Sequence, residues 1–197
     1  EDTLGLKVDI ISGEREAEYA FLGVVEEYPN ENLIIMDIGG GSTELVFIKK
    51  KELIDYKSIN IGSVRLTEKF IQSDPPETVE LFKLEKYIDE MISVVEKHFE
   101  EEDFGVIGIG GTATTISSIT QNLQEYDPLK IHGSKVSLDN IYAIIHELKS
   151  KNNLERKNII GLNPQRADII ISGIYIALRT LEYFGERGFV VSDYDNL

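Results

Sequence analysis

A run of three glycines between two apolar segments constrains the fold of this chain more than any other feature. Residues 33–36 read Leu-Ile-Ile-Met and lead into Asp37, and residues 44–48 begin with Glu44 and continue as a second apolar run. Short apolar runs bounded by glycine predict strands, and a connection this short makes them antiparallel neighbours. We therefore expect a hairpin with Asp37 and Glu44 on opposite sides of its turn.

The glycines of this turn predict a phosphate-binding role. Without a Cβ, backbone N–H groups can approach an anion closely, and two nearby carboxylates can share a hydrated Mg²⁺ or orient a water molecule. The alternative is a flexible turn with a solvated aspartate, but three consecutive glycines cost more strand stability than such a turn requires. We expect a phosphate site formed by the following residues: Asp37, Gly39, Gly40, Gly41, Ser42, Thr43 and Glu44.

A second glycine turn follows the apolar segment 104–109 and leads into a helical pattern. Gly110, Gly111 and Thr112 lie where the start of a helix favours an anion. The segment is not a dinucleotide-binding fingerprint, because Ala113 takes the third glycine position, and it is not a Walker loop, which needs Gly-Lys-Ser/Thr. A plain connection from strand to helix competes equally with a phosphate site here, and the first turn adds weight to the phosphate site.

Several charged residues have two interpretations each. Glu16 can act as a general base for water, although a carboxylate in a first helical turn more often complements the helix dipole. Arg65 lies between a strand and a helix, where it can reach a phosphate or form a surface salt bridge. Four basic residues can either contact an anionic substrate or be solvated loop charges, and the second role is the commoner one: Lys130, His132, Lys135 and Arg166.

The composition excludes several classes of function. The chain has no cysteine, so it has no disulfide, no thiolate zinc site and no cysteine nucleophile. Its net charge of -15 argues against nucleic-acid binding through a basic surface. The apolar stretch 169–178 is too short to cross a bilayer, and the amino terminus has no secretion signal. We therefore expect a cytoplasmic protein that binds neither nucleic acid nor membrane.

Periodicity predicts an α/β protein with a mixed sheet covered by helices. Three antiparallel strands come first in the sheet, and helices and strands alternate after them. We expect strands at residues 7–12, 33–38, 44–48, 53–61, 104–109 and 188–192, and helices that include residues 77–100 and 164–184.

With these motifs located, the sequence resembles the exopolyphosphatase and guanosine pentaphosphate phosphohydrolase (Ppx/GppA) family, within the superfamily of actin, sugar kinases and heat-shock ATPases. The resemblance implies a ribonuclease H-like, actin-like ATPase domain. Segments spread over nearly the whole chain carry it: 11–17, 37–44, 62–67, 108–115, 126–128, 132–133 and 166–170.

The resemblance implies a metal-dependent hydrolase that releases terminal orthophosphate from inorganic polyphosphate or from guanosine pentaphosphate. Glu16 would activate the attacking water, and Asp37 and Glu44 would hold Mg²⁺ and the water. The phosphate would be bound by the first turn (Gly39, Gly40, Gly41, Ser42, Thr43), by the opposing turn (Gly110, Gly111, Thr112) and by Arg65. Such chemistry depends chiefly on positioning and charge stabilisation.

The sequence also departs from the family. It has no earlier Asp-x-Gly-Ser-Asn-Ser type loop, so we expect residues 1–30 to be a crossover from a missing upstream lobe and residues 31–197 to be the second lobe of a homodimeric parent protein. A module that senses guanosine tetraphosphate or a nucleotide without turnover is the alternative, and a kinase lobe is a third. Glu16 and Glu44 favour hydrolysis, because a pure binder gains nothing from two carboxylates facing a polyanion.

Overall fold

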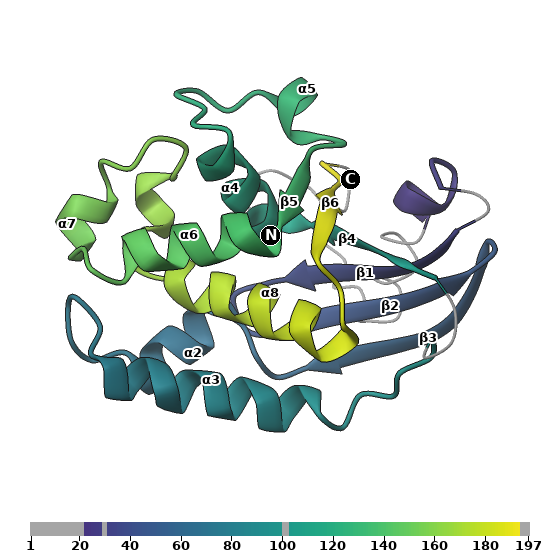
Figure 1. Cartoon of the computed structure of the whole chain (residues 1–197), viewed down its shortest axis with the longest axis horizontal. Coiled ribbons are helices and arrows are strands. Elements are labelled where there is room, and N and C mark those ends of the chain that lie inside the picture. The colour runs from purple at the N-terminus through teal and green to yellow at the C-terminus, as the bar shows by residue number, and fades with distance from the viewer. Residues whose placement is uncertain (1–21, 29–30, 100–102, 194–197) are drawn as a thin grey trace, which may run out of the picture.

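The computed structural model describes residues 22–28, 31–99 and 103–193 and contains a mixed sheet (Figure 1). The described strands are β1 (Asn32–Ile38), β2 (Thr43–Lys49), β3 (Glu52–Ile59), β4 (Gly105–Ile109), β5 (Lys135–Ser137) and β6 (Gly188–Val191). They lie in the order β3-β2-β1-β4-β6-β5. The pairs β1–β2, β2–β3 and β5–β6 are antiparallel, whereas β4 is parallel to β1 and to β6. The predicted antiparallel trio is confirmed.

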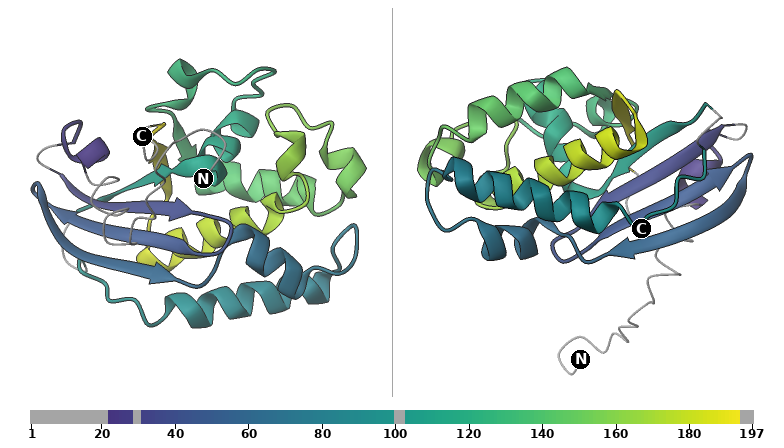
Figure 2. Two further views of the ribbon diagram at one scale, coloured as in Figure 1. Left: turned by 180° about the vertical axis from the view of Figure 1, so that it is seen from behind. Right: turned by 60° about the horizontal axis from the view of Figure 1, so that its bottom comes forward.

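Helices cover one side of β1, β2 and β3. The described helices are α2 (Ser63–Phe70), α3 (Thr78–Ile92), α4 (Gly110–Thr120), α5 (Pro128–Ile131), α6 (Leu138–Leu148), α7 (Asn153–Arg156), α8 (Ile170–Phe184) and the 3-10 turn η1 (Pro164–Arg166). Figure 2 shows α3, α6 and α8 together on this side of the sheet. The predicted α/β layer architecture is confirmed.

The two faces of the sheet pack into separate cores because side chains alternate along each strand. On β1, Ile34, Met36 and Ile38 face the helices and belong to the larger core. Leu33 and Ile35 face the opposite side and pack in a smaller core that includes Val24. The same alternation puts Asp37, at the end of β1, on the face of the smaller core.

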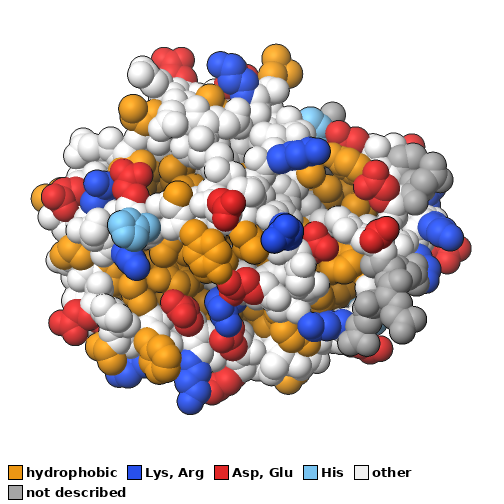
Figure 3. Space-filling view, in the orientation of Figure 1, with side chains coloured by type: hydrophobic (Ala, Val, Ile, Leu, Met, Phe, Trp, Pro, Cys, Tyr) orange, Lys and Arg blue, Asp and Glu red, His pale blue; other side chains and the backbone are white. Residues whose placement is uncertain are grey.

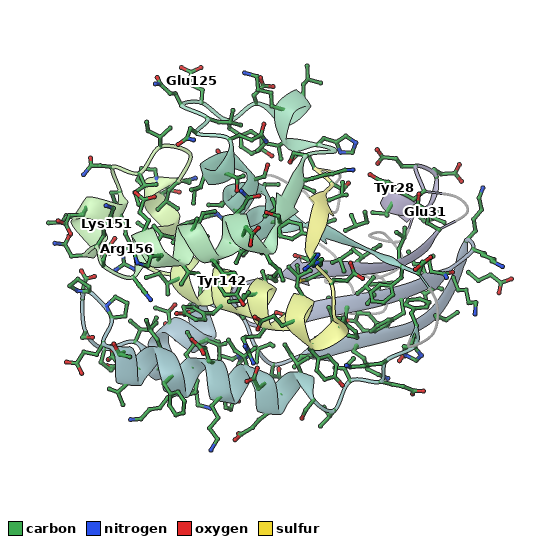
Figure 4. The ribbon with its side chains drawn as sticks, viewed as in Figure 1. Tyr28, Glu31, Glu125, Tyr142, Lys151 and Arg156 are labelled. Atoms are coloured by element: carbon green, nitrogen blue, oxygen red, sulfur yellow. The ribbon has the colours of Figure 1, made fainter. Side chains whose placement is uncertain are left out.

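Polar side-chain contacts join the helices to one another and to the loop before α3. The Tyr142 hydroxyl on α6, labelled in Figure 4, donates to the Glu182 carboxylate on α8. Arg156 on α7 is buried and its guanidinium donates to Asp74, in the loop before α3, over 2.5 Å. The first contact joins α6 to α8, and the second joins α7 to the loop before α3.

The structure corrects two predicted elements and adds one short strand. The helix expected over 77–100 ends at Ile92, because the chain then turns and buries Val95 and Phe99 in the larger core. The helix expected over 164–184 is divided into η1 and α8. The three-residue strand β5 was not predicted, since a segment this short carries no periodicity. The predicted strand 7–12 lies outside the described residues.

Acidic and basic side chains are mixed over the face in Figure 3, with apolar patches between them. No broad basic surface appears on this face. No helix within the described parts of the chain has the length and apolar character to cross a membrane.

Candidate active site

The first glycine turn joins β1 to β2 and sets Asp37 beside Glu44. The two are direct cross-strand partners in the antiparallel register, so their side chains leave the same face of the sheet. Both are half-buried. Inside the turn, the Gly39 N–H donates to the Ser42 carbonyl over 3.0 Å. The predicted hairpin geometry is therefore present.

The carbonyl groups of this turn point at the start of α2. The Ser63 N–H donates to the Gly39 carbonyl, and the N–H groups of Val64 and Arg65 donate to the Gly40 carbonyl, over 2.9 to 3.0 Å. Among the described residues, the Gly40 amide donates no hydrogen bond, and neither does the amide of Gly41. These two N–H groups are thus available to an anion, as a phosphate cradle requires.

The second glycine turn lies next to the first because β4 is parallel to β1. Gly110 begins α4 with a φ of 74°, and a Cβ at this position would lie 2.5 Å from Oδ1 of Asp37. Only glycine therefore lets the Asp37 carboxylate sit over the start of α4. The Thr112 hydroxyl is buried and donates to the Ile38 carbonyl over 2.9 Å, which ties the two turns together.

One open cavity of about 610 Å³ lies between the two turns. Its lining combines both turns with the loop that contains η1: Asp37, Ile38, Gly39, Gly40, Ser63, Gly110, Gly111, Asn163, Gln165, Arg166 and Ile169. Asp37 and Arg166 are its charged residues. Because the start of α4 adds a partial positive charge, the cavity can attract an anion although the whole chain carries -15.

Arg166, for which the sequence analysis favoured solvated loop charge over substrate contact, lines the cavity. Its guanidinium lies against Gly111, where a Cβ would be 1.9 Å from one of its terminal nitrogens. Among the described residues it has no ion-pair or hydrogen-bond partner for its side chain. The Asn163 side chain accepts from the Gln165 N–H and shapes the turn that carries Arg166. Asn163-Pro164 was expected to open a helix, and nothing in the sequence paired Arg166 with Gly111.

Some predicted site residues lie beside the cavity rather than in its wall. The Thr43 hydroxyl is buried and donates to the Ile61 carbonyl over 2.6 Å, so it braces the turn. Arg65 is exposed, and its Nε donates to the Gly41 carbonyl over 2.7 Å. Glu44, on β2, is the cross-strand partner of Asp37, and Ser42 lies in the turn two residues before Glu44. Neither Glu44 nor Ser42 lines the cavity. Glu16 lies outside the described residues.

The carboxylates of Asp37 and Glu44 suit a hard cation. Mg²⁺ in proteins keeps several waters and takes one or two carboxylates together with substrate phosphates. A pair of half-buried carboxylates beside a cavity lined by glycines and Arg166 fits that pattern. No cluster of three or more histidine, aspartate or glutamate residues that could hold a metal exists within the described ranges, so a metal here would depend on waters and phosphate for its other ligands.

Comparison with known proteins matches this chain to a phosphatase family. The model of the Ppx/GppA phosphatase family matches residues 1–195. The chain is 34% identical over 206 residues to a bifunctional 3-dehydroquinate synthase/phosphatase of Fusobacterium nucleatum, covering 100% of this chain and 30% of that protein. It is 30% identical over 200 residues to exopolyphosphatase 2 of Mycobacterium tuberculosis, covering 98% of this chain and 62% of that protein.

A solved structure has the same fold. The Ppx/GppA enzyme of Aquifex aeolicus superposes with a TM-score of 0.89 at 34% identity, covering 99% of this chain and 64% of that one. The chain thus spans less than two thirds of the length of these relatives.

Proposed function

Because this chain belongs to the Ppx/GppA phosphatase family, we propose that it forms the phosphate-holding part of a phosphohydrolase. The substrates we propose are inorganic polyphosphate and guanosine pentaphosphate, from which terminal orthophosphate would be released. The names of the family and of the exopolyphosphatase relative support this substrate class. Both substrates end in a phosphoanhydride-linked phosphate, the group that a small anion-binding cavity would take.

The shared cavity of the two glycine turns carries this proposal. The N–H groups of Gly40 and Gly111 and the guanidinium of Arg166 would contact the oxygens of the terminal phosphate. Arginine suits this task because its planar fork of donors matches phosphate geometry. Contacts of this kind stabilise charge on the transferred phosphoryl group, and positioning and charge stabilisation supply most of the catalysis in phosphoryl transfer.

Three carboxylates would complete the chemistry. Asp37 and Glu44 would hold Mg²⁺, which when bound supplies positive charge beside the phosphate oxygens. Asp37 is fixed over the start of α4 by its fit against Gly110, so it needs little reorganisation to act as a ligand. Glu16 would accept the proton of the attacking water; this role comes from the family resemblance alone.

The test measures orthophosphate release from polyphosphate and from guanosine pentaphosphate by the complete protein that contains this chain. We expect Arg166→Ala to lower kcat/KM by about 10- to 100-fold, the equivalent of a charged hydrogen bond of about 1.5–3 kcal/mol. Arg187→Ala is the matched control. Arg187 is an exposed arginine just before β6, at the opposite end of that strand from the site.

The outcomes separate the alternatives. Loss of release in Arg166→Ala, with Arg187→Ala unchanged, supports the phosphohydrolase. If Arg166→Ala and Arg187→Ala both release phosphate as fast as the unmodified protein, Arg166 does not belong to the site. Tight binding of guanosine tetraphosphate, with no release from either substrate by the unmodified protein, would favour the sensing module instead.

A further inference from the structure

Three oxygen-bearing side chains form one row across β1, β2 and β3. Asp37 is the direct partner of Glu44, and Glu44 is the direct partner of Ser58 on β3. Directly opposed residues of antiparallel strands leave the same face of the sheet, with their Cβ atoms about 4.5–5.5 Å apart. The row therefore extends the candidate metal site by one residue, toward the edge of the sheet.

Ser58 contacts Glu44 in the middle of this row. Its hydroxyl donates to Oε1 of Glu44 over 2.8 Å. A glutamate side chain at a half-exposed position would otherwise sample several rotamers, and fixing it costs side-chain entropy at the moment a ligand binds. Because Oε1 accepts this hydrogen bond, the orientation of the carboxylate is restricted before a cation binds. The other carboxylate oxygen, Oε2, is not part of this hydrogen bond.

We propose that Ser58 is a positioning residue for Glu44, holding its carboxylate in the orientation that binds a divalent cation next to Asp37. This inference rests on the proposed function, since it assumes that Glu44 is a metal ligand. Residues that hydrogen-bond a metal-ligating carboxylate orient it and tune its affinity, and their loss typically costs 10- to 100-fold in metal affinity. Ser58 is exposed, so we expect a loss near the lower end, roughly 10-fold.

The experiment compares Mn²⁺ affinity among variants of the complete protein, with Mn²⁺ as the probe and its free concentration read by electron paramagnetic resonance. Ser58→Ala removes the hydroxyl, and Ser58→Thr keeps it. Ser93→Ala is the matched control, because the Ser93 hydroxyl donates to a backbone carbonyl at the end of α3, away from the row. Thermal melting without metal reports on the fold of each variant.

We expect Ser58→Ala to bind Mn²⁺ roughly 10-fold more weakly, with an unchanged melting temperature, and Ser58→Thr to restore the affinity. Ser93→Ala should match the unmodified protein. A loss that Ser58→Thr does not restore, or a loss that comes with a lower melting temperature, would assign the effect to packing of β3 and overturn the inference.

Glu44→Gln separates this inference from the proposed function. If Glu44→Gln weakens Mn²⁺ binding and Ser58→Ala does not, Ser58 has no positioning role and the metal site stands. If both variants bind Mn²⁺ normally, Glu44 is not a ligand, and the proposed metal site fails together with the inference.

Discussion

At the scale of single residues, two glycines of the second turn leave space for a charged side chain where a Cβ would otherwise lie. Gly110 leaves room for the Asp37 carboxylate and Gly111 for the Arg166 guanidinium. The sequence identified both turns from glycine spacing alone. It could not identify Arg166, because the contact with Gly111 joins segments more than fifty residues apart and depends on how η1 lies over α4.

Gly111→Ala should displace the Arg166 guanidinium while leaving the fold intact. The new Cβ would overlap the end of a flexible side chain, which can move at little cost. We expect a fall in kcat/KM close to that of Arg166→Ala, measured as phosphate release by the complete protein. Gly105→Ala is the control, since its Cβ would meet Leu33 at an ordinary 3.5 Å. An unchanged kcat/KM in Gly111→Ala would mean that Arg166 binds phosphate from another position or not at all.

At the scale of elements, the longer strands were predictable, whereas helix boundaries were predictable only in part. Ser137 is the N-cap of α6, and its hydroxyl accepts a hydrogen bond from the Asn140 N–H, a local signal that the sequence contains. The end of α3 depends instead on burial of Val95 and Phe99 beyond it. Because both residues continue the helical spacing of α3, the pattern predicted a longer helix than the structure has.

The start of α3 contains a carboxylate whose ionisation stabilises the fold. The Ser73 hydroxyl, followed by the backbone N–H groups of Glu77, Gln72 and Ser73, lowers the pKa of Glu80 to about 2, against the effect of desolvation. A depressed pKa means that the charged form is favoured by folding. Its contribution to stability is therefore complete above the ordinary pKa of 4.5 and is lost as the pH falls toward 2.

We predict that Glu80→Gln lowers the free energy of unfolding at pH 7 and that the difference from the unmodified protein shrinks as the pH falls from 5 to about 2. Urea unfolding at several pH values measures it. Glu90→Gln removes one negative charge from the same helix at an exposed ion pair with Lys86, and it serves as the control. If the loss in the free energy of unfolding caused by Glu80→Gln does not vary with pH, the ionised form of the Glu80 carboxylate does not contribute to stability.

At the scale of the whole molecule, the α/β class, the antiparallel hairpins and the family were all predictable, whereas the strand order was not. The position of β4 beside β1, which brings the two glycine turns together, depends on parallel pairing between segments about seventy residues apart. Local periodicity contains no signal for such a pairing. The sequence nevertheless predicted that the second turn would oppose the first, through the family resemblance.

We predict that these 197 residues alone hydrolyse phosphoanhydrides far more slowly than the complete protein. In-line attack needs the phosphoryl group held from both sides, and the family resemblance implies a further phosphate loop outside this sequence. A net charge of -15 also repels a polyanion unless other donors or Mg²⁺ offset it. Phosphate release per molecule, assayed side by side, gives the comparison. Comparable rates would mean that a second phosphate loop is dispensable.

The central claim is that Asp37 and Glu44 hold the cation for hydrolysis, beside the two glycine turns that hold the phosphate. Its most direct test is Mg²⁺-dependent orthophosphate release by Asp37→Asn and Glu44→Gln in the complete protein, with Asp139→Asn, an exposed residue in the first turn of α6, as the control. Hard cations need anionic oxygen ligands, so we expect release to be abolished in the first two variants, with the fold intact, and unchanged in the third. Near-normal turnover with unchanged Mg²⁺ dependence in either site variant would contradict the account.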